Sequence, residues 1–290
     1  MKQSIAIVGC GTIGTTLGKL FAETGYPIVG VASRRLESAR STAELLGISN
    51  YSDISVHITA KADIVFITTP DVVIQSVCDE IARQNGFKRG SFVFHCSGAF
   101  PSEILASARR CGAHIGSLHP LQSFASVEQA LKMVTGCTCT FEGDTETLPI
   151  AREMAKDIGA DFIQIRVQDK PLYHAAAVVA SNYLVTLVNL AIELNQLSGI
   201  STKASIKALL PLIEGTLNNV KHLGVHRALT GPIVRGDIDT ITSHVEAIKV
   251  RAPHFWPLYR ALGNSTISLA EARGRLEKKT VREMRTIFSL

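Results

Sequence analysis

Three glycines with the spacing of a phosphate-binding turn stand near the start of the chain. Gly9, Gly11 and Gly14 follow the apolar run 5–8, which is typical of a strand, and precede 15–23, which has the pattern of a helix. In such a unit the first glycine permits a tight turn, the second lets backbone approach a pyrophosphate, and the third lets the helix pack on the strand. The helix N-terminus offers free N–H groups to the phosphates. The pattern predicts a dinucleotide site formed by Gly9, Gly11, Thr12, Ile13 and Gly14.

Polar residues after the second apolar run indicate which nicotinamide dinucleotide would bind. The run 28–31 predicts a strand, and Ser33, Arg34 and Arg35 follow it. An NAD site usually places Asp or Glu here, where it binds the ribose 2′-hydroxyl. A hydroxyl and two guanidinium groups suit a 2′-phosphate instead, because Arg binds phosphate through a fixed pair of donors. We therefore expect NADP(H), although Arg34 and Arg35 would also fit the solvated start of the next helix.

Four polar side chains stand out at the N-terminal cap of an apolar helix predicted at 171–197 or within that helix. At about 100° per residue, Lys170, His174 and Ser181 share one face, whereas Asn182 faces elsewhere. All four are candidate catalytic residues. The helix dipole would lower the pKa of Lys170, and histidine titrates near neutrality, so either side chain could donate a proton to a substrate. The alternative is a set of hydrogen-bonded core groups that tie this helix to the sheet.

A second candidate site lies in the loop 229–237, which contains a Gly-Pro and a Gly-Asp pair. Arg235 stands between two glycines and could bind a substrate carboxylate through two parallel hydrogen bonds. Asp237 or Asp239 would cap the helix that follows. Much of the segment could equally serve only to turn the chain.

Strand and helix patterns alternate through the first part of the chain. After the first two strands, further strands are predicted at 63–68, 91–94, 113–118, 137–141 and 161–165. This alternation predicts an α/β fold with a doubly wound, mostly parallel sheet. In such sheets ligands bind outside the carboxyl ends of the strands. We therefore expect the residues after these ends to line a crevice, with the cofactor contacted by Thr69, Pro70, Ser97 and Gly98 and the substrate by His119.

Strand patterns stop after Arg166, and helical patterns replace them. They cover 171–197, 202–220, 238–250, 256–262 and 266–288. We predict a dinucleotide-binding Rossmann domain at 1–167 and an all-helical domain at 168–290.

Composition is that of a folded enzyme rather than a disordered or nucleic-acid-binding chain. Of 290 residues, 46% are hydrophobic and 19% charged, and the net charge of +5 is mild and scattered. No apolar run of membrane-spanning length is expected, and the N-terminal pattern is that of a strand rather than a signal peptide. The six cysteines form no CxxC pair, which favours reduced thiols, no metal site and a cytoplasmic location.

The chain resembles the 6-phosphogluconate dehydrogenase-like group, which includes ketopantoate reductases and pyrroline-5-carboxylate reductases. More closely, it resembles predicted NADP oxidoreductases whose C-terminal domain is of unknown function. The resemblance rests on the motifs at 94–99, 117–122, 169–176 with Ser181 and Asn182, and 231–237 with His244. It implies NADP binding, hydride transfer to a small acidic substrate, and a homodimer formed through the helical domain. Lys170 matches a lysine of the ketopantoate enzymes by position, whereas His174 stands where they have Asn.

The leading hypothesis is NADPH-dependent reduction of a small 2-oxo acid of the ketopantoate type. Three alternatives remain open: reduction of a cyclic imino acid of the pyrroline-5-carboxylate type, an opine dehydrogenase-like reaction that joins two substrates, and an NADP(H)-binding sensor without turnover. Function depends on the site rather than on the fold, so fold analogy alone does not choose among them.

Overall fold

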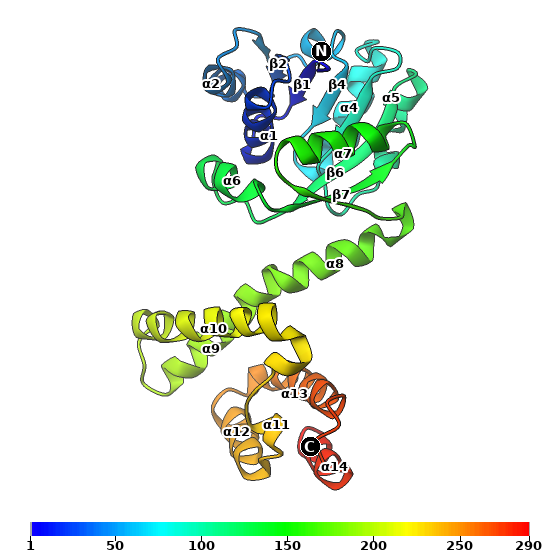
Figure 1. Cartoon of the computed structure of the whole chain (residues 1–290). Coiled ribbons are helices and arrows are strands. Elements are labelled where there is room, and N and C mark those ends of the chain that lie inside the picture. Colours follow the sequence, from blue (N-terminus) through cyan, green and yellow to red (C-terminus); the bar gives the residue numbers. More distant parts are fainter. Residues whose placement is uncertain (1, 290) are drawn as a thin grey trace. The chain divides into compact units, whose positions relative to one another are not determined.

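The computed structural model describes residues 2–289, and internal contacts divide the chain into two units after Ser181 (Figure 1). The first unit holds the sheet and the helices that cover it, and it includes the helix that begins at Lys170. The second unit consists of helices. The sequence-based boundary at 167 marks the end of the strands, whereas the division by contacts comes one helix later.

The first unit is built on one sheet with the strand order β3-β2-β1-β4-β5-β6-β7-β8. All neighbouring pairs are parallel except β6 and β7, which are antiparallel. This confirms the predicted doubly wound, mostly parallel α/β fold. The strands are β1 (Ile5–Val8), β2 (Ile28–Ala32), β3 (Tyr51–Ser52), β4 (Ile64–Ile67), β5 (Phe92–His95), β6 (His114–Leu121), β7 (Thr138–Gly143) and β8 (Asp161–Gln164).

Both faces of this sheet are buried, because successive side chains of a strand point to opposite faces and helices cover each one. In β1, Ile5 and Ile7 join the core on one face while Ala6 and Val8 join the core on the other. Helices α1, α2, α6 and α7 contribute to the first core, and α3, α4 and α5 to the second (Figure 1). The helices of this unit are α1 (Thr12–Glu23), α2 (Leu36–Leu46), α3 (Val56–Thr59), α4 (Ile74–Arg83), α5 (Ala106–Arg110), α6 (Val127–Val134), α7 (Thr147–Asp157) and α8 (Lys170–Ala180).

Several elements differ from their predicted limits. β6 continues to Leu121, so His119 lies within the strand and not after it. β7 continues to Gly143 and thereby includes Glu142. Neither the two-residue strand β3 nor helix α6 was predicted. The helix predicted at 171–197 is divided at Ser181, where φ is −114° and ψ −68°.

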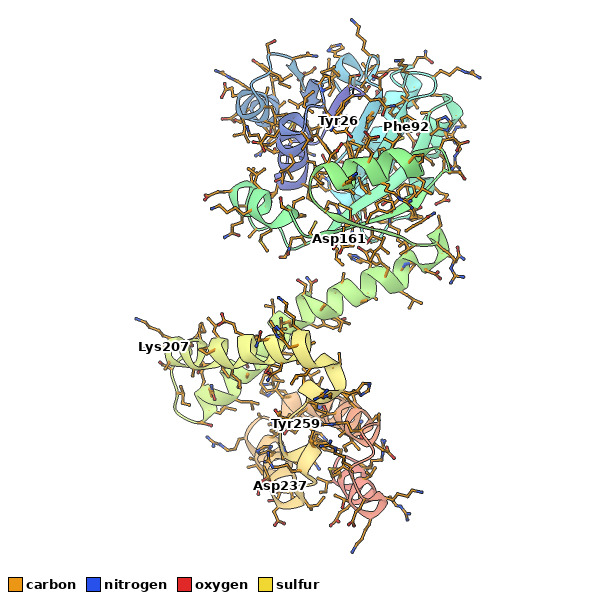
Figure 2. All side chains as sticks on the ribbon, in the orientation of Figure 1. Tyr26, Phe92, Asp161, Lys207, Asp237 and Tyr259 are labelled. Carbon is orange, nitrogen blue, oxygen red and sulfur yellow. The ribbon has the colours of Figure 1, made fainter. Side chains whose placement is uncertain are left out.

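The second unit has its core among its last three long helices. Ile241, Val245, Ile267, Met284 and Phe288 pack together there. Figure 2 marks Asp237 at the start of α12 and Tyr259 on α13. The helices of this unit are α9 (Asn182–Leu197), α10 (Thr202–Ala228), α11 (Pro232–Arg235), α12 (Ile238–Arg251), α13 (Trp256–Glu271) and α14 (Lys278–Ile287).

One helical stretch, Val167–Leu197, is long and apolar enough by length and composition to cross a membrane. The expectation that no apolar run has this length is therefore wrong. Within it, only 6% of an 18-residue apolar window is buried. Large apolar side chains are exposed along it and along α10, including Leu172, Val185, Leu212 and Leu217.

Candidate functional site

The glycine turn has the geometry that its spacing predicts. Gly9 has a φ of +114°, and a Cβ atom there would lie 2.6 Å from the carbonyl carbon of Thr68. A Cβ atom on Gly14 would lie 2.0 Å from the carbonyl oxygen of Gly9, so only glycine lets α1 approach the turn. A Cβ atom on Gly11, by contrast, would meet no other atom within 4 Å. The turn is thus tightly packed against the protein at Gly9 and Gly14. It is open at Gly11, where the protein backbone would contact a dinucleotide.

The start of α1 leaves its donors available. Gly11 is the N-cap residue, and no side chain among residues 2–289 caps the helix. The first N–H groups of α1, on Thr12 and Ile13, therefore have no side-chain capping partner in the described part of the chain and are available to an anion. Thr68 at the end of β4 fixes the turn, because its hydroxyl donates to the carbonyl oxygen of Gly9 at 2.7 Å.

Basic side chains follow β2 at the same edge of the sheet. Ser33 is half-buried, and Arg34 and Arg35 are exposed. Arg35 donates from Nε to the hydroxyl of Ser38 at 3.2 Å. Among residues 2–289, no carboxylate lies within 4.0 Å of the Arg34 guanidinium. Arg34 is therefore the guanidinium most available to a 2′-phosphate.

The ends of β4 and β5 are joined by a serine. Ser97 donates from its hydroxyl to the Asp71 carboxylate at 2.6 Å. The same hydroxyl accepts from the backbone N–H groups of Ala99 and Phe100, at 3.2 and 3.1 Å. The hydroxyl of Thr69, next to Pro70, is buried and has no hydrogen-bond partner in the described part of the chain. An unpaired hydroxyl is costly to bury, so this one fits a ligand oxygen or nitrogen beside the glycine turn.

A buried histidine supports the loop after β5. His95 accepts at Nδ1 from the backbone N–H of Ser97 at 3.1 Å, and its Nε2 lies 3.3 Å from the carbonyl oxygen of Pro101. An imidazole that accepts at one nitrogen and donates at the other is neutral. Burial lowers the pKa of His95 to about 3, and the charge of Lys170 contributes in the same direction. His95 is thus a structural group that holds the loop in place.

Acid should destabilise the protein through His95 and His119. Burial lowers their folded-state pKa values to about 3 and about 4, below the value of about 6.5 in an unfolded chain. The unfolded state therefore binds protons first, so the stability from these neutral rings is present above about pH 6.5 and is lost as the pH falls toward 4.

Between these pH values, each ring should lower the free energy of unfolding by about 1.4 kcal/mol for every unit by which the pH falls. We expect a lower urea midpoint at pH 5 than at pH 7, and a shallower pH dependence for His95→Gln. Equal midpoints would contradict the burial of both rings as neutral groups.

Two imidazoles and a glycine converge beside this loop. A Cβ atom on Gly98 would lie 2.8 Å from His174 Nδ1 and 2.9 Å from His119 Nε2, so both ring nitrogens pack against Gly98, and only glycine leaves room for them. The Tyr173 hydroxyl lies 2.8 Å from the other nitrogen of His119, Nδ1. A tyrosine that donates to Nδ1 leaves the ring proton on Nε2. His174 Nδ1 is buried and has no hydrogen-bond partner among residues 2–289.

Beneath these rings lies a buried ion pair. The Lys170 ammonium is 2.9 Å from Glu142 Oε1, and their side chains are 3% and 1% exposed. Glu142 also accepts from the backbone N–H and the hydroxyl of Ser102, at 2.9 and 2.7 Å. Lys170 donates in addition to the hydroxyl of Ser117. Burial lowers the pKa of Lys170 and the negative charge of Glu142 opposes that shift. The direction agrees with the prediction, but burial rather than the helix dipole is its main cause.

Only two of the four predicted catalytic residues lie near the sheet. Lys170 and His174 lie near the sheet, with Lys170 enclosed and His174 beside Gly98. Ser181 and Asn182 are exposed, at the end of α8 and the start of α9. Helix periodicity places Ser181, but not Asn182, on the same face as Lys170. In the described residues, no hydrogen bond joins either side chain to Lys170 or to its partners Glu142 and Ser117. Their catalytic role stays a prediction.

The loop around Arg235 belongs to the second unit. Asp237 caps α12, as predicted, by accepting from the backbone N–H of Thr240 at 3.2 Å. Arg235 lies 3.6 Å from the Asp237 carboxylate, and its side chain is 64% exposed. This contact is long and leaves the guanidinium free to bind another carboxylate.

Several residues of the candidate site could not be identified from the sequence. Glu142 looks like part of an ordinary strand, and only the pairing of β7 with β6 brings it to Lys170. Ser102 lies 40 residues from Glu142 in the chain. Tyr173 was not identified because helix periodicity places it on a different face from Lys170. Their roles depend on tertiary contacts and not on local pattern.

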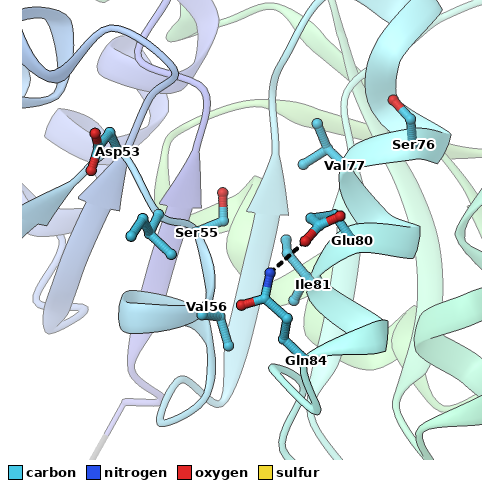
Figure 3. Close-up of a pocket in the computed structure, with 9 residues that line it drawn as sticks. Asp53, Ser55, Val56, Ser76, Val77, Glu80, Ile81 and Gln84 are labelled. Atoms are coloured by element: carbon cyan, nitrogen blue, oxygen red, sulfur yellow. Dashed lines mark hydrogen bonds between the residues drawn. The ribbon is translucent and has the colours of Figure 1, made fainter.

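A separate pocket of about 330 Å³ lies between α3 and α4 (Figure 3). Asp53 and Glu80 are among the residues that line it, and Gln84 donates a hydrogen bond to Glu80. Two carboxylates would repel a phosphate, and no predicted site residue lines the pocket. We assign it no role.

Comparisons with known protein families give a domain order that agrees with the fold. Residues 1–120 match the model of a Rossmann-like domain, and residues 137–266 match a domain of unknown function, DUF2520. A Rossmann-like domain is therefore followed by a DUF2520 domain. This confirms the domain content that the resemblance implied. No curated protein matches the chain.

Solved structures share the fold over nearly the whole length. A protein from Thermotoga maritima has 29% sequence identity and a TM-score of 0.76, over 93% of this chain and 100% of that one. A protein from Bacteroides fragilis, described as a candidate NADP oxidoreductase, has 24% identity and a TM-score of 0.73, over 92% and 98%. A pyrroline-5-carboxylate reductase from Coxiella burnetii has 14% identity and a TM-score of 0.61, over 99% of each chain.

Proposed function

We propose that this protein is an NADP(H)-dependent oxidoreductase that reduces a small substrate. The observation that carries the proposal is the common position of the glycine turn and the His119–His174 pair at the carboxyl edge of one parallel sheet. The residues at this edge fit the dinucleotide: the open backbone at Gly11, the uncapped start of α1, the unpaired Thr69 hydroxyl and the free Arg34 guanidinium. The fold shared with a candidate NADP oxidoreductase supports it.

The chemistry follows from the two imidazoles. Bound NADPH would supply a hydride to a carbonyl or imine carbon. His119 Nε2 and His174 Nδ1 both lie against Gly98, and one of these rings would donate the proton that a substrate oxygen or nitrogen accepts. Of the two donors that the sequence left open, Lys170 and His174, the geometry favours His174. Lys170 donates its hydrogen bonds inside the protein, to Glu142 and Ser117, and acts by holding its surroundings in place.

Two substrate classes fit this site. A cyclic imino acid of the pyrroline-5-carboxylate type is supported by the shared fold of a pyrroline-5-carboxylate reductase. A 2-oxo acid of the ketopantoate type is supported by the position of Lys170 at the start of the first helix after the sheet. Both are carboxylates. Arg235 stays the predicted residue for binding such a group, and Ser181 and Asn182 stay predicted polar contacts.

Oxidation of NADPH, followed at 340 nm, tests this function. The panel contains pyrroline-5-carboxylate, ketopantoate and simple 2-oxo acids, each run beside NADH. Turnover of at least one substrate with preference for NADPH is the expected result. Tight NADPH binding without turnover of any carbonyl or imine would favour the sensor alternative instead.

Arg34 should determine the preference for NADPH over NADH. We expect Arg34→Gln to weaken NADPH binding by about tenfold or more, because a charge-assisted contact to the 2′-phosphate is lost, and to leave NADH binding nearly unchanged. Fluorescence titration with each dinucleotide measures this. Arg40→Gln is the matched control, since Arg40 is exposed on the helix that follows and pairs with Glu44 at 2.9 Å. Equal losses for both dinucleotides would show that Arg34 does not contact the 2′-phosphate.

We further propose a homodimer formed through the helical region. The apolar side chains of α9 and α10, among them Val185, Leu212 and Leu217, are exposed to water. Packing against the same helices of a second copy of the chain would bury them. All six cysteines are free, which supports the proposed cytoplasmic location. Sedimentation velocity should give twice the chain mass of 31.2 kDa. A monomer at micromolar concentration would contradict the dimer.

A further inference from the structure

A concave basic surface lies in the helical unit, where the end of α10 meets the segment between α13 and α14. Its volume is about 470 Å³. It is lined by Leu223, His226, Arg227, Arg273 and Arg275, hereafter the arginine pocket. Within the described residues, no acidic side chain lines it. Four of its five side chains are therefore cationic or can become so.

Local structure brings these side chains together. Helix α10 is broken at Gly224, where φ is 74° and ψ 163°, so that His226 and Arg227 stand on a separate last turn. Arg273 is half-buried and donates from Nη1 to the carbonyl oxygen of Leu229 at 2.8 Å. This bond joins the segment after α13 to the residue that follows α10. The two walls of the arginine pocket are thus held against each other by the protein itself.

The positive charge of the pocket is not balanced within the described chain. Among residues 2–289, no carboxylate lies within 4.0 Å of Arg227, Arg273 or Arg275. On the neighbouring helices, by contrast, Arg285 pairs with Glu271 at 3.1 Å. Placement near a helix C-terminus accounts for His226 and Arg227, since cations are favoured there. Arg273 lies two residues after the end of α13 and is favoured in the same way, whereas Arg275 lies four residues after that end, beyond the reach of this effect.

We propose that the arginine pocket binds a small phosphate-bearing anion. Each guanidinium presents five N–H donors in a plane, which matches the oxygens of a phosphate through paired hydrogen bonds. Three such groups around one concavity exceed what a single carboxylate requires and suit a phosphate or pyrophosphate group. Like charges gathered in this way repel one another, and a bound anion removes that repulsion. This site lies outside the sheet unit and is independent of the dinucleotide site proposed above.

Titration of the ¹⁵N-labelled full chain with inorganic pyrophosphate, at low salt, tests the proposal. We expect saturable shifts of the backbone amides at 223–229 and 272–277, which surround the pocket. Inorganic phosphate and a simple alkyl phosphate form the other arms. Binding of all three identifies the phosphate group itself as the ligand, whereas binding of the alkyl phosphate alone identifies a phosphorylated metabolite.

Charge removal provides the second half of the test. The double variant Arg227→Gln/Arg275→Gln should bind pyrophosphate about tenfold or more weakly. Arg273 is kept, because it holds Leu229 and its loss could disturb the fold. Arg282→Gln, an exposed arginine on α14, is the control and should bind as the wild type does.

Two results would overturn the proposal. One is the absence of saturable shifts at these amides up to about 10 mM ligand. The other is unchanged affinity in the double variant. Shifts confined to the amides at 9–14 would likewise exclude the arginine pocket while supporting the dinucleotide site, so failure of one proposal is distinguishable from failure of the other.

Discussion

Replacing Glu142 by alanine should lower the free energy of unfolding by about 3–5 kcal/mol, because the variant leaves the Lys170 ammonium buried without its counter-charge. Both side chains of the pair are almost fully enclosed, at 3% and 1% exposure. The same change also removes the acceptor for Ser102, whose N–H and hydroxyl are buried. Urea unfolding at pH 7, followed by circular dichroism, measures the effect.

A surface ion pair provides the matched control. Lys132 and Glu128 lie 3.0 Å apart but are 73% and 83% exposed, so Glu128→Ala should cost no more than about 0.5 kcal/mol. The double variant Glu142→Gln/Lys170→Met should be more stable than Glu142→Ala, because no charge is then left buried. If Glu142→Ala and Glu128→Ala had the same small effect, Lys170 would have access to water and the enclosed ion pair would be refuted.

Replacing His174 by glutamine should lower kcat by about 100-fold or more, because general acid catalysis is lost while a polar side chain remains. His174 Nδ1 lies against Gly98, as His119 Nε2 does, and it has no hydrogen-bond partner among the described residues. NADPH affinity should change little, since the glycine turn and Arg34 lie after other strands. Steady-state rates on the substrate identified by the 340 nm assay give kcat, and fluorescence titration gives the affinity.

His114→Gln is the control for this experiment. His114 begins β6, the strand that also carries His119, but it faces Glu146 at 3.8 Å instead of Gly98. Its replacement should leave kcat within about twofold of the wild type. The assignment of His174 would be wrong if His174→Gln turned over at the wild-type rate.

The fold of the first unit was predictable because its signals are local. Apolar runs such as 5–8 and 28–31 correspond to β1 and β2, and the glycine spacing indicated the turn between β1 and α1. The antiparallel β7 was not predictable, since a strand's direction depends on the path of the connection and not on its own residues. The break at Ser181 likewise has no local signal, because Ser is compatible with a helix.

The site could be predicted only in part. Residues at strand ends, such as Ser97 and Gly98, followed from the rule that ligands bind at the carboxyl ends of parallel strands. Lys170 was identified as unusual, but its burial depends on Glu142, which pairs with it only after β6 and β7 have formed. The arrangement of His174 and His119 around Gly98 required the three-dimensional contact between α8 and the sheet.

The most direct test of the proposed function is transfer of deuterium from NADPH labelled at C4. The labelled dinucleotide, in each of its two stereochemical forms, is incubated with the enzyme and the substrate panel, and the products are analysed by mass spectrometry. We predict one deuterium at the former carbonyl or imine carbon of one product, from one of the two forms. NADPH that binds tightly but transfers no deuterium to any member of the panel would contradict the proposed hydride transfer.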